Sequence, residues 1–254
     1  VRWSPLQAWA GFWRNVEVVV DWFFGFSSPV GRPMQRVPEP ELMEGHAQAE
    51  AYAAADFSAG DQAVIERLAQ LFPEGLGLRL LDLGCGPGNI SFRLARRWPQ
   101  AAVVGVDGAS AMLQLAEAQL AEEAPLHGRV RFERAYLPDP QLAGGYSAVV
   151  SNSLLHHLHD PAVLWQSVRQ LGASGACVYI KDLRRPASAA AAEALRQLYL
   201  ADAPAVLQHD YLASLHAAFT PEEVVQQLQQ AGLADQLQVA AVQDRYLEVW
   251  GRLD

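Results

Sequence analysis

The sequence has 254 residues, of which 51% are hydrophobic and 19% charged, and its formal net charge is −9. This length and composition predict a folded α/β domain with a sizeable core and exclude a disordered protein. The acidic balance excludes an extended nucleic-acid surface, because phosphates are bound by clustered lysine and arginine. The two cysteines, Cys85 and Cys177, match neither a disulfide framework nor zinc spacing, so we expect a reducing, cytoplasmic compartment and no metal site.

The first 26 residues form an aromatic-rich leader. Polar and charged residues interrupt it, so we expect neither a transmembrane helix nor a signal peptide. It can pack on its own domain as an amphipathic lid, lie at a membrane surface, or bury itself in a dimer partner. Lysine and arginine are sparse, so membrane contact is not favoured. Residues 1–40 are therefore expected to form a leader and a proline-punctuated linker, containing the four tryptophans Trp3, Trp9, Trp13 and Trp22.

From residue 41 the pattern alternates between helix and strand. A helical segment over residues 41–57 carries Tyr52, and Asp61 is expected to be the N-cap of a second helix. The expected strands cover residues 79–83, 102–106, 130–134, 148–152 and 177–181. The helices expected between them cover residues 90–98, 109–121 and 161–171. This order predicts a doubly wound parallel sheet that binds ligands at the carboxyl ends of its strands.

After residue 185 the pattern changes. Residues 186–205 are expected to be helical, and Thr220 opens a further helix with a capping box. Two β-like runs over residues 238–242 and 246–250 predict an antiparallel pair. The expected fold is α/β: a Rossmann-like, doubly wound, seven-stranded and mostly parallel sheet with an antiparallel C-terminal pair. Residues 41–254 would form this domain, with residues 183–220 as a helical cap.

A glycine-rich turn follows the first strand, with glycines at alternate positions: Gly84, Gly86 and Gly88. A dinucleotide-binding turn needs G-x-G-x-x-G, but Asn89 stands where the third glycine would fall. Asp82, inside the strand, suits a ligand that brings a cation and would repel a pyrophosphate. Asp107, at the end of the second strand, can accept two hydrogen bonds from a ribose diol. A tight turn that binds no ligand is the alternative.

Together these features resemble a class I S-adenosylmethionine-dependent methyltransferase, from residue 41 to the C-terminus. The resemblance is most specific over residues 80–89, 103–107 and 151–161. It implies S-adenosylmethionine as cofactor and S-adenosylhomocysteine as product. The cofactor-binding residues it implies are Gly84, Cys85 and Gly86 under the methionine part, Asp82 near its ammonium, Asp107 on the ribose, Gly108 and Met112 beside the adenine, Asn152 and Ser153 near the sulfonium, and Tyr52 as a lid. Ala135 is expected to be a further cofactor-binding residue. The usual adenine-binding aspartate before Ala135 is missing.

Methyl transfer is an in-line displacement, so the protein mainly aligns the reactants in a site that excludes water. A base is needed only where the acceptor must lose a proton. His156 and His157, which follow the fourth strand, are the candidates, although each can also be a packed or solvent-facing loop residue. Asp182, after the fifth strand, can orient a substrate or anchor its loop through Arg184 or Arg185.

Residues 202–219, with Tyr211, are expected to cap the acceptor pocket or to form a solvated helical hairpin. The acceptor is expected to be a small molecule whose O, N or C atom is the nucleophile, and no nucleic-acid partner is expected. An oligomer is compatible with the aromatic leader. A noncatalytic S-adenosylmethionine-binding sensor or scaffold is the alternative function, because the adenine-binding aspartate is missing. A nucleotide-dependent oxidoreductase is disfavoured by the glycine spacing.

Overall fold

The computed structural model describes residues 34–39 and 57–254, which belong to one compact unit of residues 32–254. The aromatic leader and the helix expected over residues 41–57, including Tyr52, lie outside the described residues except for the last position of that helix. No helix in the described part is long and apolar enough to cross a membrane.

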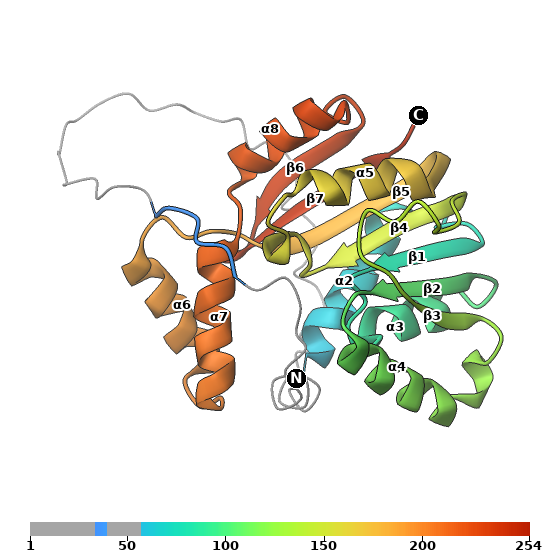
Figure 1. Ribbon diagram of the computed structural model, residues 1–254, viewed down its shortest axis with the longest axis horizontal. Coiled ribbons are helices and arrows are strands. Elements are labelled where there is room, and N and C mark those ends of the chain that lie inside the picture. Colours follow the sequence, from blue (N-terminus) through green and yellow to red (C-terminus); the bar gives the residue numbers. More distant parts are fainter. Residues whose placement is uncertain (1–33, 40–56) are drawn as a thin grey trace, which may run out of the picture. The chain divides into compact units, whose positions relative to one another are not determined.

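Seven strands form one sheet in the order β3-β2-β1-β4-β5-β7-β6 (Figure 1). The strands are β1 (Arg79–Leu83), β2 (Ala102–Asp107), β3 (Val130–Arg134), β4 (Tyr146–Asn152), β5 (Gly172–Leu183), β6 (Leu237–Val242) and β7 (Tyr246–Arg252). β1 to β5 are parallel, and β7 is antiparallel to both of its neighbours. The predicted fold class is confirmed. Chain connections leave β1 and β4 in opposite directions, which is where such sheets bind ligands.

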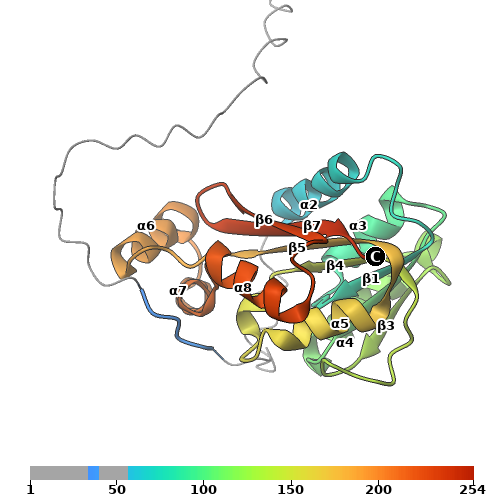
Figure 2. The ribbon, with the colours of Figure 1, turned by 90° about the horizontal axis from the view of Figure 1, so that it is seen from above.

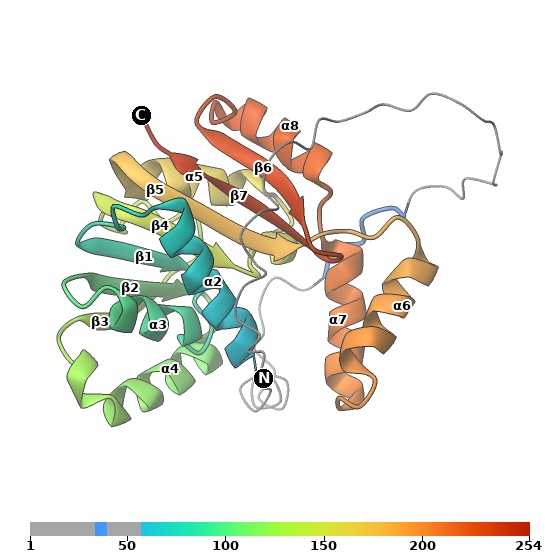
Figure 3. The same ribbon diagram turned by 180° about the vertical axis from the view of Figure 1, so that it is seen from behind.

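Helices cover both faces of the sheet. The helices are α2 (Ser58–Leu71), α3 (Asn89–Arg97), α4 (Ser110–Glu122), α5 (Ala162–Leu171), α6 (Ala189–Leu200), α7 (Ala205–Ala217) and α8 (Pro221–Ala231), with 3₁₀ turns η1 (Ala124–Leu126) and η2 (Leu155–His157). α5 and α8 lie on one face, and α2 and α3 lie on the other (Figures 2 and 3). Both faces are therefore buried, as parallel sheets require.

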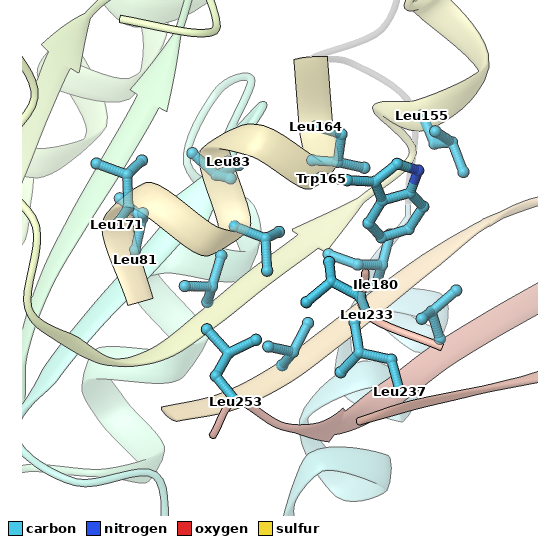
Figure 4. Close-up of a cluster of buried hydrophobic side chains, with 14 of the residues drawn as sticks. Leu81, Leu83, Leu155, Leu164, Trp165, Leu171, Ile180, Leu233, Leu237 and Leu253 are labelled. Carbon is cyan, nitrogen blue, oxygen red and sulfur yellow. The ribbon is translucent and has the colours of Figure 1, made fainter. Parts of the chain in front are cut away.

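Alternation along the strands divides the core into two layers. Leu81 and Val104 face α5 and α8, whereas their neighbours Leu80 and Val103 face α2 and α3. Successive side chains of a strand point to opposite faces, so one apolar run supplies both layers. Figure 4 shows the first layer, in which Trp165 of α5 is fully buried.

Two predictions about helix ends have different outcomes. Asp61 was expected to be an N-cap, but α2 begins three residues earlier and Asp61 lies inside it. The N-cap prediction is therefore wrong. The buried Asp61 carboxylate lies 3.4 Å from Arg93 Nη1 of α3 and joins α2 to α3. The capping box of α8 is confirmed: Thr220 Oγ1 accepts from Glu223 N, and Glu223 Oε2 accepts from Thr220 N.

The helix expected over residues 186–205 is shorter than predicted, and a separate helix follows it. α6 ends at Leu200 and α7 begins at Ala205, directly after Pro204. A proline disfavours helical backbone in the residue before it, so the break falls where the proline stands. The two helices pack side by side (Figure 1) around a small apolar cluster that includes Leu183 and Leu215. α7 also contacts η2, which brings this pair to the carboxyl end of β4.

Candidate functional site

The glycine turn after β1 is bonded to the end of β2. Val106 O accepts from Gly84 N at 2.8 Å and from Cys85 N at 3.1 Å. The next amide, Gly86 N, donates to Asp107 Oδ2 at 2.8 Å. Three consecutive backbone amides are thus held by two residues of β2. This arrangement holds the turn in one conformation at the carboxyl edge of the sheet.

Two glycines of this turn are needed for different reasons. Gly86 has φ of +53°, and a Cβ built on it would meet no atom within 4 Å. Its backbone therefore faces open space, where a ligand can approach closely. A Cβ on Gly84 would come within 2.8 Å of the Leu154 side chain. The absence of a side chain at Gly84 lets the segment after β4 pack directly on the turn.

Asp107 connects the turn to α4. Its Oδ2 accepts from Gly86 N and its Oδ1 accepts from Ala109 N, each at 2.8 Å. Burial raises the pKa of Asp107, against the lowering effect of these backbone amides. A carboxylate has about four acceptor positions, so about two remain for hydroxyl donors. The predicted ribose-binding group therefore keeps acceptor capacity at the end of β2.

Asp82 lies in the interior of the fold. Its carboxyl group is buried, and Ser91 Oγ of α3 donates to Asp82 Oδ2 at 2.6 Å. Burial raises the pKa of Asp82 to about 7, partly offset by the hydrogen bond from Ser91. The observed contact joins β1 to α3 beneath the glycine turn. The predicted place of the Asp82 carboxylate near a ligand's ammonium group stays a prediction.

The residues predicted to surround the adenine gather at the ends of β2 and β3. Ala135 N donates to Asp107 O at 3.1 Å, and Met112 is buried in a small cluster of α4. Gly108 O accepts from Arg134 Nε at 3.1 Å. Arg134 stands directly before Ala135, where the usual aspartate is missing. A guanidinium only donates, so the amino group of an adenine needs another acceptor here.

Cys85 contributes to the turn through its backbone. A Cβ on Gly105 of β2 would come within 2.9 Å of Cys85 Sγ, so the thiol lies against the sheet. Burial raises the pKa of the Cys85 thiol well above its ordinary value. The thiol is therefore a packed apolar group, and its predicted role under a cofactor can only concern the main chain.

The end of β4 has strained backbone. Ser153 has φ of +61°, a left-handed conformation that residues other than glycine seldom adopt. Its amide donates to Lys181 O of β5 at 2.9 Å, which holds the strained residue in place. Such strain is concentrated at ligand sites. Asn152 and Ser153 thus turn the chain sharply where it passes the glycine turn. Their predicted place near the sulfonium stays a prediction.

His156 and Asp182 form a buried pair at the ends of β4 and β5. His156 Nδ1 lies 2.5 Å from Asp182 Oδ1, while Asp182 Oδ2 accepts from Leu155 N at 2.6 Å. Asp182 therefore orients a histidine, and the alternative that it anchors its loop through Arg184 or Arg185 is wrong. Those two arginines donate instead to a set of backbone carbonyls and one carboxylate: Gln243 O, Asp244 O, Ala218 O and Glu223 Oε1.

Glu39 reaches both histidines from the predicted linker. Its Oε1 lies 3.4 Å from His156 Nε2 and 3.2 Å from His157 Nδ1. Ser214 Oγ of α7 donates to the Glu39 carboxylate at 3.1 Å and 3.3 Å. Sequence reasoning missed Glu39, because a glutamate between two prolines in a linker carries no local signal of a site.

Arg36 anchors the same segment, which we call the strap (residues 34–39). Its guanidinium donates to Ala217 O at 2.6 Å, to Leu158 O at 2.8 Å and to His156 O at 3.1 Å. It also stacks over the Phe219 ring at 4.0 Å. The strap therefore lies across η2 and the end of α7, directly over the two histidines.

Burial and charge act in opposite directions on this group. Burial lowers the pKa of His156, but the charge and hydrogen bond of Asp182, with the charge of Glu39, outweigh it and raise the pKa. Burial also raises the pKa of Glu39, and the charges of Asp182 and Asp210 add to this. Each group is thus more readily protonated than in water.

Tyr211 lies in the apolar cluster of the α6–α7 pair, beside Leu183 and Tyr246. Burial raises the pKa of its hydroxyl group. Its predicted contact with an acceptor stays a prediction. His159 Nε2 lies 2.8 Å from the backbone carbonyl oxygen of Glu39.

Known proteins match this chain over its central part. Residues 80–175 match the family described as "Methyltransferase domain". The chain is 38% identical over 109 residues to a trans-aconitate 2-methyltransferase of Deinococcus radiodurans, covering 41% of this chain and 39% of that protein. It is 32% identical over 113 residues to a ubiquinone biosynthesis O-methyltransferase of Leptothrix cholodnii, covering 43% and 46%. The matched part is less than half of either relative.

Solved structures share the fold over a larger part of the chain. A SAM-dependent methyltransferase from Aquifex aeolicus superposes with a TM-score of 0.58 at 15% identity, covering 82% of this chain and 98% of that one. A plantazolicin methyltransferase in complex with a substrate analogue and S-adenosylhomocysteine gives 0.63 at 14% identity, covering 82% and 90%. At these identities the likeness shows the fold alone.

Proposed function

Because the chain carries a class I S-adenosylmethionine-dependent methyltransferase domain, we propose that it transfers a methyl group from S-adenosylmethionine to a small-molecule acceptor. One observation carries this proposal: the open backbone of Gly86 and the Asp107 carboxylate meet in a single hydrogen bond. They lie at the sheet edge where doubly wound folds bind ligands.

The residues at this edge suit the cofactor. Gly86 leaves the space that a side chain would fill, and Asp107 retains acceptor capacity for a ribose diol. Gly108, Met112 and Ala135 would surround the adenine. When bound, S-adenosylmethionine supplies a methyl group on a positively charged sulfur.

The chain's own task is to position the acceptor and to exclude water. The strap and α7 cover the ends of β4 and β5, and His156 is almost fully buried beneath them. For an acceptor that must lose a proton, His156 Nε2 is the proposed base. Asp182, bonded to Nδ1, would then stabilise the imidazolium.

The proposed class of acceptor is argued from the net charge of the chain and from the names of its relatives. The net charge of −9 disfavours nucleic acid, and the relatives are named for trans-aconitate and for ubiquinone biosynthesis. The family match ends at residue 175, before α6, α7 and the proposed cap of residues 183–220. We therefore propose a small molecule without carrying over either named acceptor.

Calorimetry with S-adenosylmethionine, S-adenosylhomocysteine and NAD tests the cofactor. We expect binding of the first two and none of NAD, and binding of NAD alone would overturn the proposal. Transfer of a labelled methyl group across a fractionated metabolite extract then tests the reaction and identifies the acceptor. Cofactor binding with no labelled product from any fraction would favour the sensor alternative.

A further inference from the structure

The strap and η2 bring together three side chains of the types that bind metal ions. One ligand atom each from Glu39, His156 and His157 lies within 4.8 Å of the other two. They come from two segments more than a hundred residues apart in the sequence. We propose that these three residues bind a divalent transition-metal ion of the Zn²⁺ type.

The observed distances suit four-coordinate zinc. Zinc binds imidazole nitrogen and carboxylate oxygen at about 2.0–2.2 Å, so two ligand atoms of a tetrahedral site lie about 3.3 Å apart. Glu39 Oε1 lies 3.2 Å from His157 Nδ1 and 3.4 Å from His156 Nε2. Six-coordinate geometry at the same bond lengths would require about 2.9 Å. The two distances from Glu39 are thus close to the spacing that a zinc ion needs, and the two histidine nitrogens lie within 4.8 Å of each other.

A second layer of contacts orients two of these ligands. His156 Nδ1 lies 2.5 Å from Asp182 Oδ1, and in the neutral tautomer that donates from Nδ1 the Nε2 lone pair is available to an ion on the side of Glu39. A carboxylate behind a histidine is the usual support for a metal-binding imidazole. Ser214 Oγ donates to the Glu39 carboxylate and supports the third ligand. His156 and Glu39 are therefore held in place before any ion binds.

The charges around the group favour a cation. The charges of Asp182 and Asp210 raise the pKa of Glu39, and the charges of Asp182 and Glu39 raise the pKa of His156. In the described part of the chain, Arg36 is the arginine whose charge opposes this effect on His156. The Arg36 guanidinium is already bonded to three backbone carbonyls. Two imidazoles in the ligand set disfavour Mg²⁺ and Ca²⁺, which prefer oxygen ligands, and favour zinc-like ions.

A bound ion would have two consequences. Because Glu39 belongs to the strap and the histidines belong to η2, the ion would tie the strap to the domain. Three protein ligands also leave a fourth position for water or substrate, as in catalytic zinc sites. An oxygen of the acceptor could occupy that position. His156 Nε2, being a ligand, would then not serve as the base proposed above, and the ion would instead lower the pKa of the bound acceptor oxygen. This second consequence rests on the proposed function.

Metal binding is measured on the full chain after treatment with a chelator and dialysis. Titration calorimetry with Zn²⁺ gives affinity, mass spectrometry gives stoichiometry, and visible absorption of the Co²⁺ form reports coordination. The variants are Glu39→Gln and His157→Gln. His127→Gln is the matched control, because His127 is an exposed histidine before β3. Circular dichroism and S-adenosylhomocysteine binding check that each variant is folded.

We expect one Zn²⁺ per chain in the wild type and the control. Each ligand variant should bind at least about 100-fold more weakly, since loss of a supporting contact alone costs about 10–100-fold. Wild-type affinity no better than that of the variants, or full affinity in Glu39→Gln, would overturn the inference. S-adenosylhomocysteine binding without Zn²⁺ binding would reject the metal site alone, whereas the reverse would reject the proposed cofactor.

Discussion

Replacing Asp107 by alanine tests the cofactor site most directly. The carboxylate accepts from Gly86 N and Ala109 N, each at 2.8 Å, and is proposed to accept from the ribose hydroxyls as well. Asp107→Ala removes all of these bonds at once. It should therefore weaken cofactor binding and loosen the glycine turn.

The magnitude follows from the number and type of bonds. A hydrogen bond to a charged group contributes about 1.5–3 kcal/mol, so two ribose bonds are worth at least about 3 kcal/mol. This corresponds to a dissociation constant raised by at least about 100-fold, at 1.4 kcal/mol per factor of ten. Loss of the two backbone bonds to the same carboxylate should, at that value per bond, lower the free energy of unfolding by about 3–6 kcal/mol.

Calorimetry with S-adenosylhomocysteine measures the affinity, and thermal unfolding without ligand measures the structural part. Asp139→Ala is the matched control. Asp139 Oδ1 also accepts a backbone hydrogen bond two residues along the chain, from Gln141 N at 2.8 Å, but in an exposed loop. The control should leave the dissociation constant unchanged.

A dissociation constant of Asp107→Ala within about twofold of the wild-type value would refute the reasoning, because a single bond to a charged group is worth more. It would show that the ribose does not bind at the end of β2. A fall in stability with unchanged affinity would leave Asp107 as a residue that only shapes the turn.

Three further variants test separate features. Gly86→Ala should raise the cofactor dissociation constant more than tenfold in calorimetry, because its new Cβ enters the open space proposed for the ligand. It should also lower the unfolding free energy by about 1–2 kcal/mol, because alanine is strained at φ of +53°. Trp165→Ala should lower the unfolding free energy in denaturant by about 3–5 kcal/mol, since that side chain is fully buried. Asp82→Asn should flatten the pH dependence of stability. The raised pKa of about 7 means that Asp82 stabilises the fold in its protonated form, below pH 3.8, and that this contribution is lost as the pH rises through about 7. The wild type should therefore lose stability over that range relative to Asp82→Asn, in denaturant titrations at several pH values.

Each of these predictions has a contradicting outcome. Unchanged affinity in Gly86→Ala would mean that the ligand does not approach this amide. Full stability in Trp165→Ala would mean that the core of Figure 4 does not depend on this residue. Parallel pH curves for the wild type and Asp82→Asn would mean that Asp82 is ionised in the fold over the whole range.

Local patterns predicted the sheet and the glycine turn. β1 and β3 have the bounds expected from the sequence. β1 is a short, mostly buried run that ends at a glycine, whereas in the edge strand β3 the apolar Val130 and Phe132 alternate with charged residues. Asp107 follows from its position at the end of β2. The capping box of α8 was also predictable, because it involves only four consecutive residues, from Thr220 to Glu223.

Contacts between distant segments could not be predicted in this way. His156 and Asp182 were each placed at a strand end, but their pairing depends on β4 and β5 being neighbours in register. Glu39 and Arg36 lie in a segment whose prolines indicate only an extended linker. Their partners lie more than a hundred residues further along the chain. Asp61 was misplaced because a favourable N-cap residue type was read without the neighbouring Arg93.

One backbone amide of the strap, that of Val37, can report whether the strap lies on α7. The side chain of Val37 is 58% exposed, yet its backbone amide donates to His216 O at 3.0 Å. An amide at an exposed residue normally exchanges its hydrogen quickly unless such a bond is kept. Exchange at this single amide therefore measures how often the strap lifts from α7. A substrate or ion that enters beneath the strap would be visible there, as a changed exchange rate, without being labelled itself.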